Sequence, residues 1–118
     1  MPAKVLIVDD YAPFRQLARR LVEGVGLDVI GEASTGSEAL SAVERMRPDV
    51  VLLDIQLPDL DGLAVAKLVC SVSNAPIVVL VSSRDAVDYG PRLKNCGALG
   101  FIAKADLSAE SLLALLAG

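Results

Sequence analysis

The chain alternates between short, continuous apolar runs and longer stretches in which apolar residues recur every three or four positions. Continuous runs rich in β-branched residues occupy positions 5–8, 50–53 and 77–81. Strands that are covered on both faces, as in parallel sheets, have this composition. Two weaker runs, at positions 28–33 and 100–103, fit two more strands. The pattern therefore predicts five strands, spread over the whole chain.

The stretches between these runs carry apolar stripes typical of amphipathic helices. Pro13 stands where a first helical turn tolerates proline, and Thr35 and Glu38 have the spacing of a capping box. Gly90 and Pro91 interrupt the fourth stretch, so we expect its helix to begin near Pro91 and to be short. The residues predicted to face the core from the other four helices are Phe14, Leu17, Ala18, Leu21 and Val22; Ala39, Leu40 and Val43; Val65, Leu68, Val69 and Val72; and Ala109, Leu112, Leu113 and Leu116.

Strand and helix alternate five times along the sequence, with no linker and no internal repeat. Right-handed crossover connections would place helices on both faces of one parallel sheet. The order of elements therefore predicts a doubly wound α/β domain of three layers. Folds of this kind bind their ligands at the carboxyl ends of the strands, near the point where the strand order reverses.

The composition narrows the function classes. Hydrophobic residues make up 53% of the 118 residues, which suits one domain with one aliphatic core over residues 1–118. The net charge of −4 and the lack of a basic run argue against direct binding of nucleic acid. No apolar run approaches the roughly 20 residues of a membrane span, and the start lacks the features of a signal peptide. We expect a cytoplasmic protein with no membrane partner, in which Cys70 and Cys96 are packing residues.

Polar residues of an unusual kind follow four of the five predicted strands. Asp9 and Asp10 end the first strand, Asp54 the third and Ser82 the fourth, and Lys104 follows the fifth. Three clustered carboxylates raise one another's pKa unless a cation lies among them. Mg²⁺ fits best, because it binds one or two carboxylates and leaves room for phosphate oxygens. The lysine and the serine could hold the other oxygens of a phosphoryl group, which makes Asp54 the candidate reactive residue.

These residues also have ordinary structural interpretations. The pair Asp9 and Asp10 could cap the helix that follows, and Ser83 competes with Ser82 for the role of the strand-end hydroxyl. Lys104 on its own would be a solvated surface residue, and the aromatic Phe101 on its own would be a core residue. Two more groups have simple interpretations. Arg15, Arg19 and Arg20 form a solvated helix face or contact an acidic docking partner, and Asp59, Asp61 and Gly62 form a turn.

Four segments closely resemble the motifs of the receiver domain of bacterial two-component response regulators. They are VLIVDD at 5–10, DVVLLDIQLPDLDG at 49–62, VVLVSS at 78–83 and GALGFIAK at 97–104. The resemblance covers essentially all of the chain, and the four motifs have the expected order and spacing. It implies the flavodoxin-like (βα)5 fold, with a five-stranded parallel sheet in the order 2-1-3-4-5.

The resemblance also implies a role for each site residue. Asp54 would accept the phosphoryl group. Asp10, Asp54 and the backbone carbonyl of Gln56 would bind Mg²⁺ directly, and Asp9 would assist through a water molecule. Ser82 would donate a hydrogen bond to the phosphoryl group, and Lys104 would pair with it.

Three further positions follow from the same resemblance. Phe101 is in the place of the aromatic switch residue, which turns inward as the hydroxyl moves toward the phosphate. Gln56 and Arg84 would flank the path of the hydrolytic water, and the long Arg84 side chain is expected to slow loss of the phosphoryl group. From the Gly90–Pro91 dipeptide we expect a mobile or partly unwound segment over residues 84–90.

A member of this family would be a signalling switch and not an enzyme. The phosphoryl donor would be a phosphohistidine on a sensor histidine kinase or a histidine phosphotransfer protein. The face built by the fourth helix, the fifth strand and the fifth helix would then control an effector domain or target protein. Ala105 stands where the family often has a proline after the lysine. Without that proline, a cis peptide bond after Lys104 is not expected. In this respect the chain resembles receivers that are joined to helix-turn-helix transcription regulators.

Other interpretations stay open from the sequence. The chain could be a stand-alone receiver, or an interaction module that has lost phosphorylation or binds a cofactor as flavodoxin does. A phosphatase of the haloacid dehalogenase type is disfavoured, because that class carries a DxD motif after its first strand and residues 9–11 read DDY. Leu115 is expected to lie outside the core-facing stripe of the last helix, where it could support a homodimer or contact an effector domain.

Overall fold

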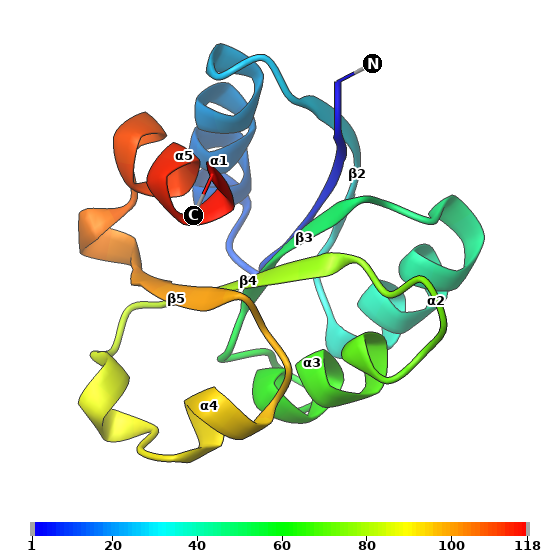
Figure 1. Ribbon diagram of the computed structural model, residues 1–118, viewed down its shortest axis with the longest axis vertical. Helices are drawn as coiled ribbons and strands as arrows, with labels where there is room; N and C mark the ends of the chain where they lie inside the picture. The colour runs from blue at the N-terminus through cyan, green and yellow to red at the C-terminus, as the bar shows by residue number, and fades with distance from the viewer. Residues whose placement is uncertain (1, 118) are drawn as a thin grey trace.

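A computed structural model describes residues 2–117, in which five parallel strands form one sheet between two layers of helices (Figure 1). The strands are β1 (Lys4–Val8), β2 (Asp28–Ala33), β3 (Val50–Asp54), β4 (Ile77–Ser82) and β5 (Gly100–Ala103). The helices are α1 (Ala12–Gly24), α2 (Gly36–Met46), α3 (Gly62–Cys70), α4 (Arg92–Asn95) and α5 (Ala109–Ala117), with short 3-10 turns η1 (Ala86–Asp88) and η2 (Lys104–Asp106). The strand order is β2-β1-β3-β4-β5, so the predicted doubly wound fold and its order are confirmed.

The sheet has one apolar core on each face. Residues of β1 alternate between the two cores: Leu6 and Val8 pack under α2, α3 and α4, whereas Val5 and Ile7 pack under α1 and α5. Figure 1 shows the same division of helices between the two faces. Because the central strands are covered on both sides, their runs are continuously apolar, as the sequence predicted.

The order of the strands determines where polar residues can meet. β1 and β3 lie side by side in the middle of the sheet, although a helix, a strand and a second helix separate them in sequence. From β1 the chain passes to β2 at one edge of the sheet. It then returns to β3, on the other side of β1, and continues through β4 to β5 at the opposite edge. The switch point of the fold is therefore between the carboxyl ends of β1 and β3, which are the ends that carry the acidic residues.

The predicted helical stripes were wrong at their margins. In α5, Leu113 is 46% exposed, whereas Leu115 and Leu116 pack against the core together with Leu112. The Leu115 methyl groups lie directly over Gly100 of β5, so the prediction that Leu115 lies outside the core was also wrong. The buried face of α5 is therefore rotated relative to the predicted one. Gly100 has no side chain, and Leu115 packs into the space that a side chain there would fill.

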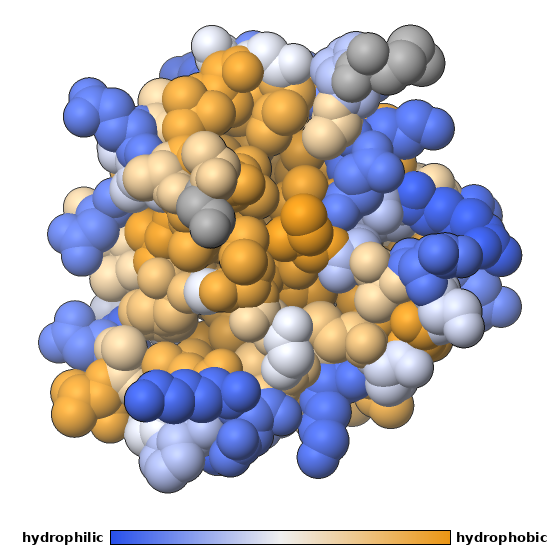
Figure 2. Space-filling model, viewed as in Figure 1, coloured by the Kyte–Doolittle hydropathy of each residue, from blue (hydrophilic) through white to orange (hydrophobic). Residues whose placement is uncertain are grey.

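Three other residues predicted to face the core are largely exposed: Leu17 of α1, Leu68 of α3 and Val72 just beyond it. Each lies at the edge of a stripe whose centre is buried. Figure 2 shows apolar surface gathered over α1 and α5 on the face that it presents. The chain has more apolar residues than the two cores can bury, so the pattern alone overestimates the width of each buried stripe.

The break in the fourth helix is as predicted. α4 begins directly after Pro91 and is four residues long, and the chain before it forms only the short turn η1. Gly90 has a φ of +60°, a left-handed backbone conformation that glycine adopts without a steric penalty. Both cysteines are free thiols, Cys96 buried and Cys70 half-buried. No helix within residues 2–117 is long and apolar enough to cross a membrane.

Candidate functional site

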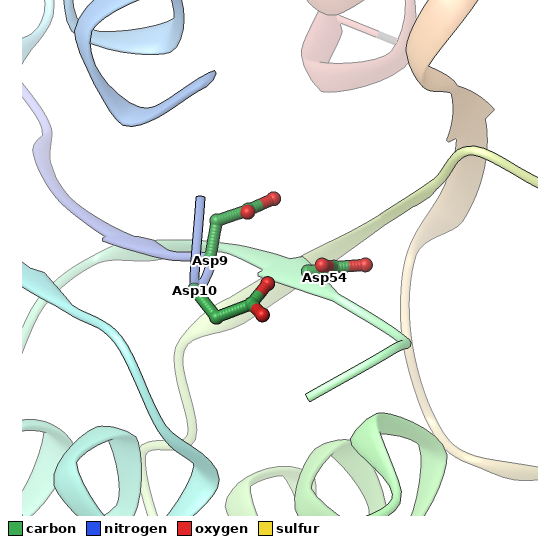
Figure 3. Close-up of side chains that lie close together, drawn as sticks. All are labelled: Asp9, Asp10 and Asp54. Carbon is green, nitrogen blue, oxygen red and sulfur yellow. The ribbon is translucent and has the colours of Figure 1, made fainter. Parts of the chain in front are cut away.

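The three predicted carboxylates converge at the switch point of the sheet. Asp9 follows β1, Asp10 comes next in the loop, and Asp54 is the last residue of β3. One carboxylate oxygen from each lies within 4.8 Å of the others, and all three side chains point into the same space (Figure 3). Asp9 and Asp54 are buried and Asp10 is exposed, so the cluster opens to solvent on one side.

Asp54 is held in an environment that disfavours its charge. It is only 3% exposed, and burial raises its pKa to about 6. A hydrogen bond from the Gln56 backbone N–H to Oδ1, at 3.0 Å, opposes this shift, while the neighbouring charge of Asp9 adds to it. The ammonium of Lys104, whose Nζ lies 3.5 Å from Asp54 Oδ2, also lowers the pKa of Asp54. At neutral pH Asp54 is therefore ionised, but nearby positive charge balances its negative charge only weakly. A carboxylate in this state is stabilised by a bound cation or a positively charged partner.

The fully buried Asp9 tests whether the residues fit a metal ion. Its Oδ1 accepts a hydrogen bond from the Tyr11 backbone N–H at 2.9 Å. Its Oδ2 is buried and accepts no hydrogen bond within residues 2–117, although Lys104 Nζ approaches to 2.7 Å as an ion pair. This buried oxygen, paired with an ammonium, lies beside two further carboxylates, and together they form a donor set of hard oxygen ligands, which fits Mg²⁺.

Lys104 lies across the top of this cluster. Its side chain is mostly buried, and Nζ lies between Asp9 Oδ2 and Asp54 Oδ2. The ammonium also sits 4.3 Å from the centre of the Phe14 ring on α1, in the geometry of a cation–π contact. The sequence pattern identified Phe14 only as a core residue, since nothing in a helical stripe indicates which ring will face a cation.

The two candidate hydroxyls, those of Ser82 and Ser83, differ in burial and in their hydrogen-bond partners. Ser82 is the last residue of β4 and is fully buried; its Oγ accepts a hydrogen bond from the Arg84 backbone N–H at 3.0 Å. Its Oγ also lies 2.6 Å from the hydroxyl of Tyr89. Ser83 is exposed and donates to the side-chain carbonyl of Gln56 at 3.1 Å. Ser82 is thus the buried strand-end hydroxyl, and Ser83 contacts Gln56.

Phe101 and Arg84 lie at the margin of the site. Phe101 is half-buried on β5, and its ring centre lies 6.2 Å from that of Tyr89, with the rings tilted by 56°. Arg84 has an exposed side chain, while its backbone N–H contacts Ser82. Tyr89 therefore contacts both residues implied as switch elements. Sequence reasoning missed it, because it lies in an irregular segment that has no periodic pattern.

The loop after β3 is packed tightly against the strand that carries Asp54. A Cβ added at Gly62 would lie 2.5 Å from the backbone oxygen of Asp54, so only glycine fits there. Asp61 caps α3 through the Leu63 N–H at 3.0 Å and forms an ion pair with Arg92 of α4. Asp61, which was predicted only as a turn residue, therefore also holds α4 through its ion pair with Arg92.

Asp59 in the same loop reaches α2. It accepts hydrogen bonds from the Gly36 and Ser37 backbone N–H groups at 2.7 and 3.0 Å, and these bonds lower its pKa. Thr35 caps the same helix through the Glu38 N–H at 3.0 Å, which is half of the predicted capping box; the Glu38 carboxylate accepts from the Ser34 backbone N–H at 2.9 Å instead of that of Thr35. The loop that follows Asp54 is therefore fixed at both ends.

The loop after β1 is fixed by an arginine from α1. Arg15 donates to the backbone carbonyl of Asp9 at 2.7 Å and to Glu32 of β2 at 3.0 Å. Arg19 also pairs with Glu32, at 2.8 Å, and both arginines lower the pKa of Glu32 against the effect of its burial. Arg20 is exposed, whereas Arg15 and Arg19 are half-buried. Two of the three are thus committed to a partner within the domain.

Comparison with known proteins gives a family. The family model described as "Response regulator receiver domain" matches residues 5–117. Among curated relatives, the transcriptional regulatory protein PdtaR of Mycobacterium tuberculosis is 36% identical over 106 residues, or 88% of this chain. The DNA-binding response regulator MtrA of Mycolicibacterium paratuberculosis is 39% identical over 106 residues, again 88% of this chain. The chain spans 50% of the first and 45% of the second, about half of each relative.

Further similar proteins include a methylesterase and two solved structures. A protein-glutamate methylesterase/protein-glutamine glutaminase of Hahella chejuensis is 48% identical over 79 residues, which are 67% of this chain and 23% of that protein. The structure of the chemotaxis response regulator CheY4 of Vibrio cholerae is 28% identical, with a TM-score of 0.85 and coverage of 99% of this chain and 98% of that one. The response regulator domain of Thermotoga maritima CheB is also 28% identical, with a TM-score of 0.84 and coverage of 97% and 92%.

Proposed function

The chain belongs to the family of response regulator receiver domains of two-component systems, and from that premise we propose that it is a switch in which Asp54 accepts a phosphoryl group. The observation that carries this proposal is the convergence of Asp54 with two carboxylates and with the ammonium of Lys104 at the switch point of the sheet. A buried carboxylate whose charge is poorly compensated is suited to react with an electrophilic phosphorus atom.

The proposed reaction is an in-line displacement. A carboxylate oxygen of Asp54 forms a bond to the phosphorus of a phosphohistidine while the phosphorus–nitrogen bond breaks, and the imidazole nitrogen keeps the electron pair. The nucleophile must be ionised, and its pKa of about 6 leaves it so at neutral pH. Lys104, already 3.5 Å from Asp54, offsets the charge of the transferred oxygens, so the protein contributes positioning and electrostatics.

The residues proposed to hold Mg²⁺ are those that the resemblance to receiver domains implies. Asp10, Asp54 and the Gln56 carbonyl would be direct ligands, whereas Asp9, already paired with Lys104 at 2.7 Å, would assist through water. Bound there, Mg²⁺ supplies positive charge beside the phosphoryl oxygens and relieves the repulsion among the carboxylates.

The output would come from the side of the domain that carries Ser82 and Phe101. Ser82 would donate to the phosphoryl group, and Phe101 would respond through the face of α4, β5 and α5. Hydrolysis would reset the switch, with Gln56 and Arg84 flanking the path of the attacking water. The domain would thus regulate and would not turn over a substrate.

The proposed partners are proteins. The phosphoryl donor is a sensor histidine kinase or a histidine phosphotransfer protein, and the receiver of the signal is an effector domain or a target protein. The names of the curated relatives, one of them DNA-binding, support a transcription regulator domain as that effector. We assign the whole of residues 1–118 to one receiver domain, acting in the cytoplasm.

Incubation with Mg²⁺ and acetyl phosphate tests the proposal. Intact mass should rise by one phosphate in the wild type and in Asp59→Asn, a matched change in the same loop, but not in Asp54→Asn. No gain in the wild type, or an equal gain in Asp54→Asn, would contradict the proposal. Continuous turnover of a phosphate ester would instead favour the phosphatase interpretation.

A further inference from the structure

The hydroxyl of Ser82 has a closely defined set of hydrogen bonds. It is fully buried, and it contacts two groups: the Arg84 backbone N–H at 3.0 Å and the Tyr89 hydroxyl at 2.6 Å. β3 and β4 pair with Asp54 opposite Val81, so Ser82 comes one position beyond the reactive carboxylate on the neighbouring strand. What Tyr89 does to this hydroxyl therefore bears on any group attached to Asp54.

A serine hydroxyl has one proton to donate and two lone pairs to accept with. The Arg84 N–H can only donate, so it occupies one lone pair of Ser82. Tyr89 either occupies the second lone pair as a donor or takes the serine proton as an acceptor. Only the first arrangement leaves the single proton of Ser82 available for a phosphoryl oxygen.

Two arguments favour Tyr89 as the donor. A phenol is a stronger acid than an aliphatic alcohol, which makes the phenol the better donor and the alcohol the better acceptor of a pair. Hydrogen bonds in a chain also polarise one another. Once Ser82 donates to an anionic oxygen, its own oxygen becomes a better acceptor, so the bond from Tyr89 and the bond to the phosphoryl group strengthen each other.

We propose that Tyr89 is a positioning residue of the phosphoryl site: by donating to Ser82 it fixes the serine proton toward the group on Asp54. The inference rests on the proposed function and names a residue that this function leaves unassigned. Tyr89 is well placed for the role, because it follows the turn η1 directly and its ring packs against Phe101. Occupancy of Asp54 is thereby linked to the segment that leads into α4.

Binding of beryllofluoride with Mg²⁺ measures this effect, since the complex mimics a phosphoryl group on a carboxylate. The dissociation constant would be determined by fluorine NMR for the wild type, Tyr89→Phe, Ser82→Ala and the double variant. Tyr89→Phe keeps the ring against Phe101 and removes only the hydroxyl. We expect it to weaken binding about three- to tenfold, the usual range for one hydrogen bond.

The double variant separates positioning from a structural effect. If Tyr89 acts through Ser82, adding Tyr89→Phe to Ser82→Ala should change the affinity by less than about twofold. Tyr11→Phe is the control, because Tyr11 is the other tyrosine of the chain and its side chain is 63% exposed. In the unaltered protein, the Tyr89 hydroxyl proton should exchange with water more slowly once beryllofluoride is bound, a measurement that needs no variant.

The sign of the result decides the outcome. Unchanged binding in Tyr89→Phe, or an equal loss in the Ser82→Ala background, would overturn the inference. Tighter binding would overturn it as well, because Tyr89 would then compete with the phosphoryl group for Ser82. Failure of the proposed function looks different: the wild type would not bind beryllofluoride, or Asp54→Asn would bind it equally well.

Discussion

The ammonium of Lys104 lies 2.7 Å from Oδ2 of Asp9, closer than the 3.5 Å that separates it from Oδ2 of Asp54. In the unphosphorylated domain the lysine is thus held mainly by the carboxylate that is not the proposed nucleophile. Asp54 is left with a weaker partner and a raised pKa. A phosphoryl group on Asp54 would bring its own negative oxygens to a lysine that is already close and buried.

The raised pKa of Asp54 predicts how stability depends on pH without divalent ions. Its folded value of about 6 lies above the ordinary value of 3.8, so the folded state favours the protonated form. The contribution of Asp54 to stability is therefore full below about pH 4 and is lost as the pH rises through about 6. Removing the charge with Asp54→Asn should stabilise the protein near pH 7.5 by about 1–2 kcal/mol, after allowance for solvent screening.

Urea unfolding in EDTA, from about pH 4 to about pH 7.5, measures this difference. The gap in unfolding free energy between Asp54→Asn and the wild type should widen as the pH rises. Asp59→Asn provides the control: the pKa of Asp59 is lowered from 3.8, so its contribution is lost only below about pH 4, and the gap for this variant should stay nearly constant over the range. A gap for Asp54→Asn that is constant over the range would show that burial does not disfavour its charge.

Gly62 is predicted to be the least replaceable glycine beside the site. An added methyl group would meet the backbone of Asp54 and Ile55 at 2.5 Å, and backbone atoms cannot move aside as a flexible side chain does. Gly62→Ala should lower the unfolding free energy by about 2–3 kcal/mol. The matched change Gly24→Ala, where nothing lies within 4 Å, should be neutral or stabilising by up to about 1 kcal/mol. Equal effects of the two changes would refute the account of this loop.

Arg84 is predicted to control how long the phosphoryl group persists. Its side chain is exposed, and its backbone N–H contacts Ser82 of the site. Arg84→Ala should speed loss of phosphate from the labelled protein roughly threefold, or about 0.6 kcal/mol of barrier. The control is Arg20→Ala, an exposed arginine on α1. An unchanged dephosphorylation rate in Arg84→Ala would end this hypothesis.

The segment from 84 to 90 is predicted to open more readily than the sheet beside it. Except for the half-buried Tyr89, its side chains are exposed, and its regular structure is limited to the three-residue turn η1. Amide hydrogen exchange should be fast there and slow in β3 and β4. Protection of this segment equal to that of the strands would contradict the expectation of a partly unwound helix.

The sequence was most informative where the signal is local. A continuous apolar run that ends in Asp54 marks both a covered strand and a polar residue at its carboxyl end. Strand order then brings such ends together, so the positions of Asp9, Asp10 and Lys104 could be predicted without coordinates. The break before α4 was equally readable, because Pro91 acts on the backbone of its own neighbours.

Contacts that depend on tertiary packing could not be predicted. Tyr89 reaches Ser82 across an irregular turn, and no periodicity fixes the direction of its ring. Phe14 has the spacing of any core residue, and only the path of Lys104 turns it into a cation–π partner. In α5 the rotation of the helix is set by the space over Gly100, which the residues of the helix itself do not encode.

The central claim is that Asp54 carries the phosphoryl group, and trapping the acyl phosphate tests it most directly. Borohydride reduces an aspartyl phosphate to homoserine, and peptide fragmentation then locates the altered residue. After treatment with acetyl phosphate and Mg²⁺, homoserine should appear at position 54 alone, and it should be absent when EDTA replaces Mg²⁺. Homoserine at Asp9 or Asp10, or a stable phosphate on Ser82 with Asp54 unmodified, would contradict the account.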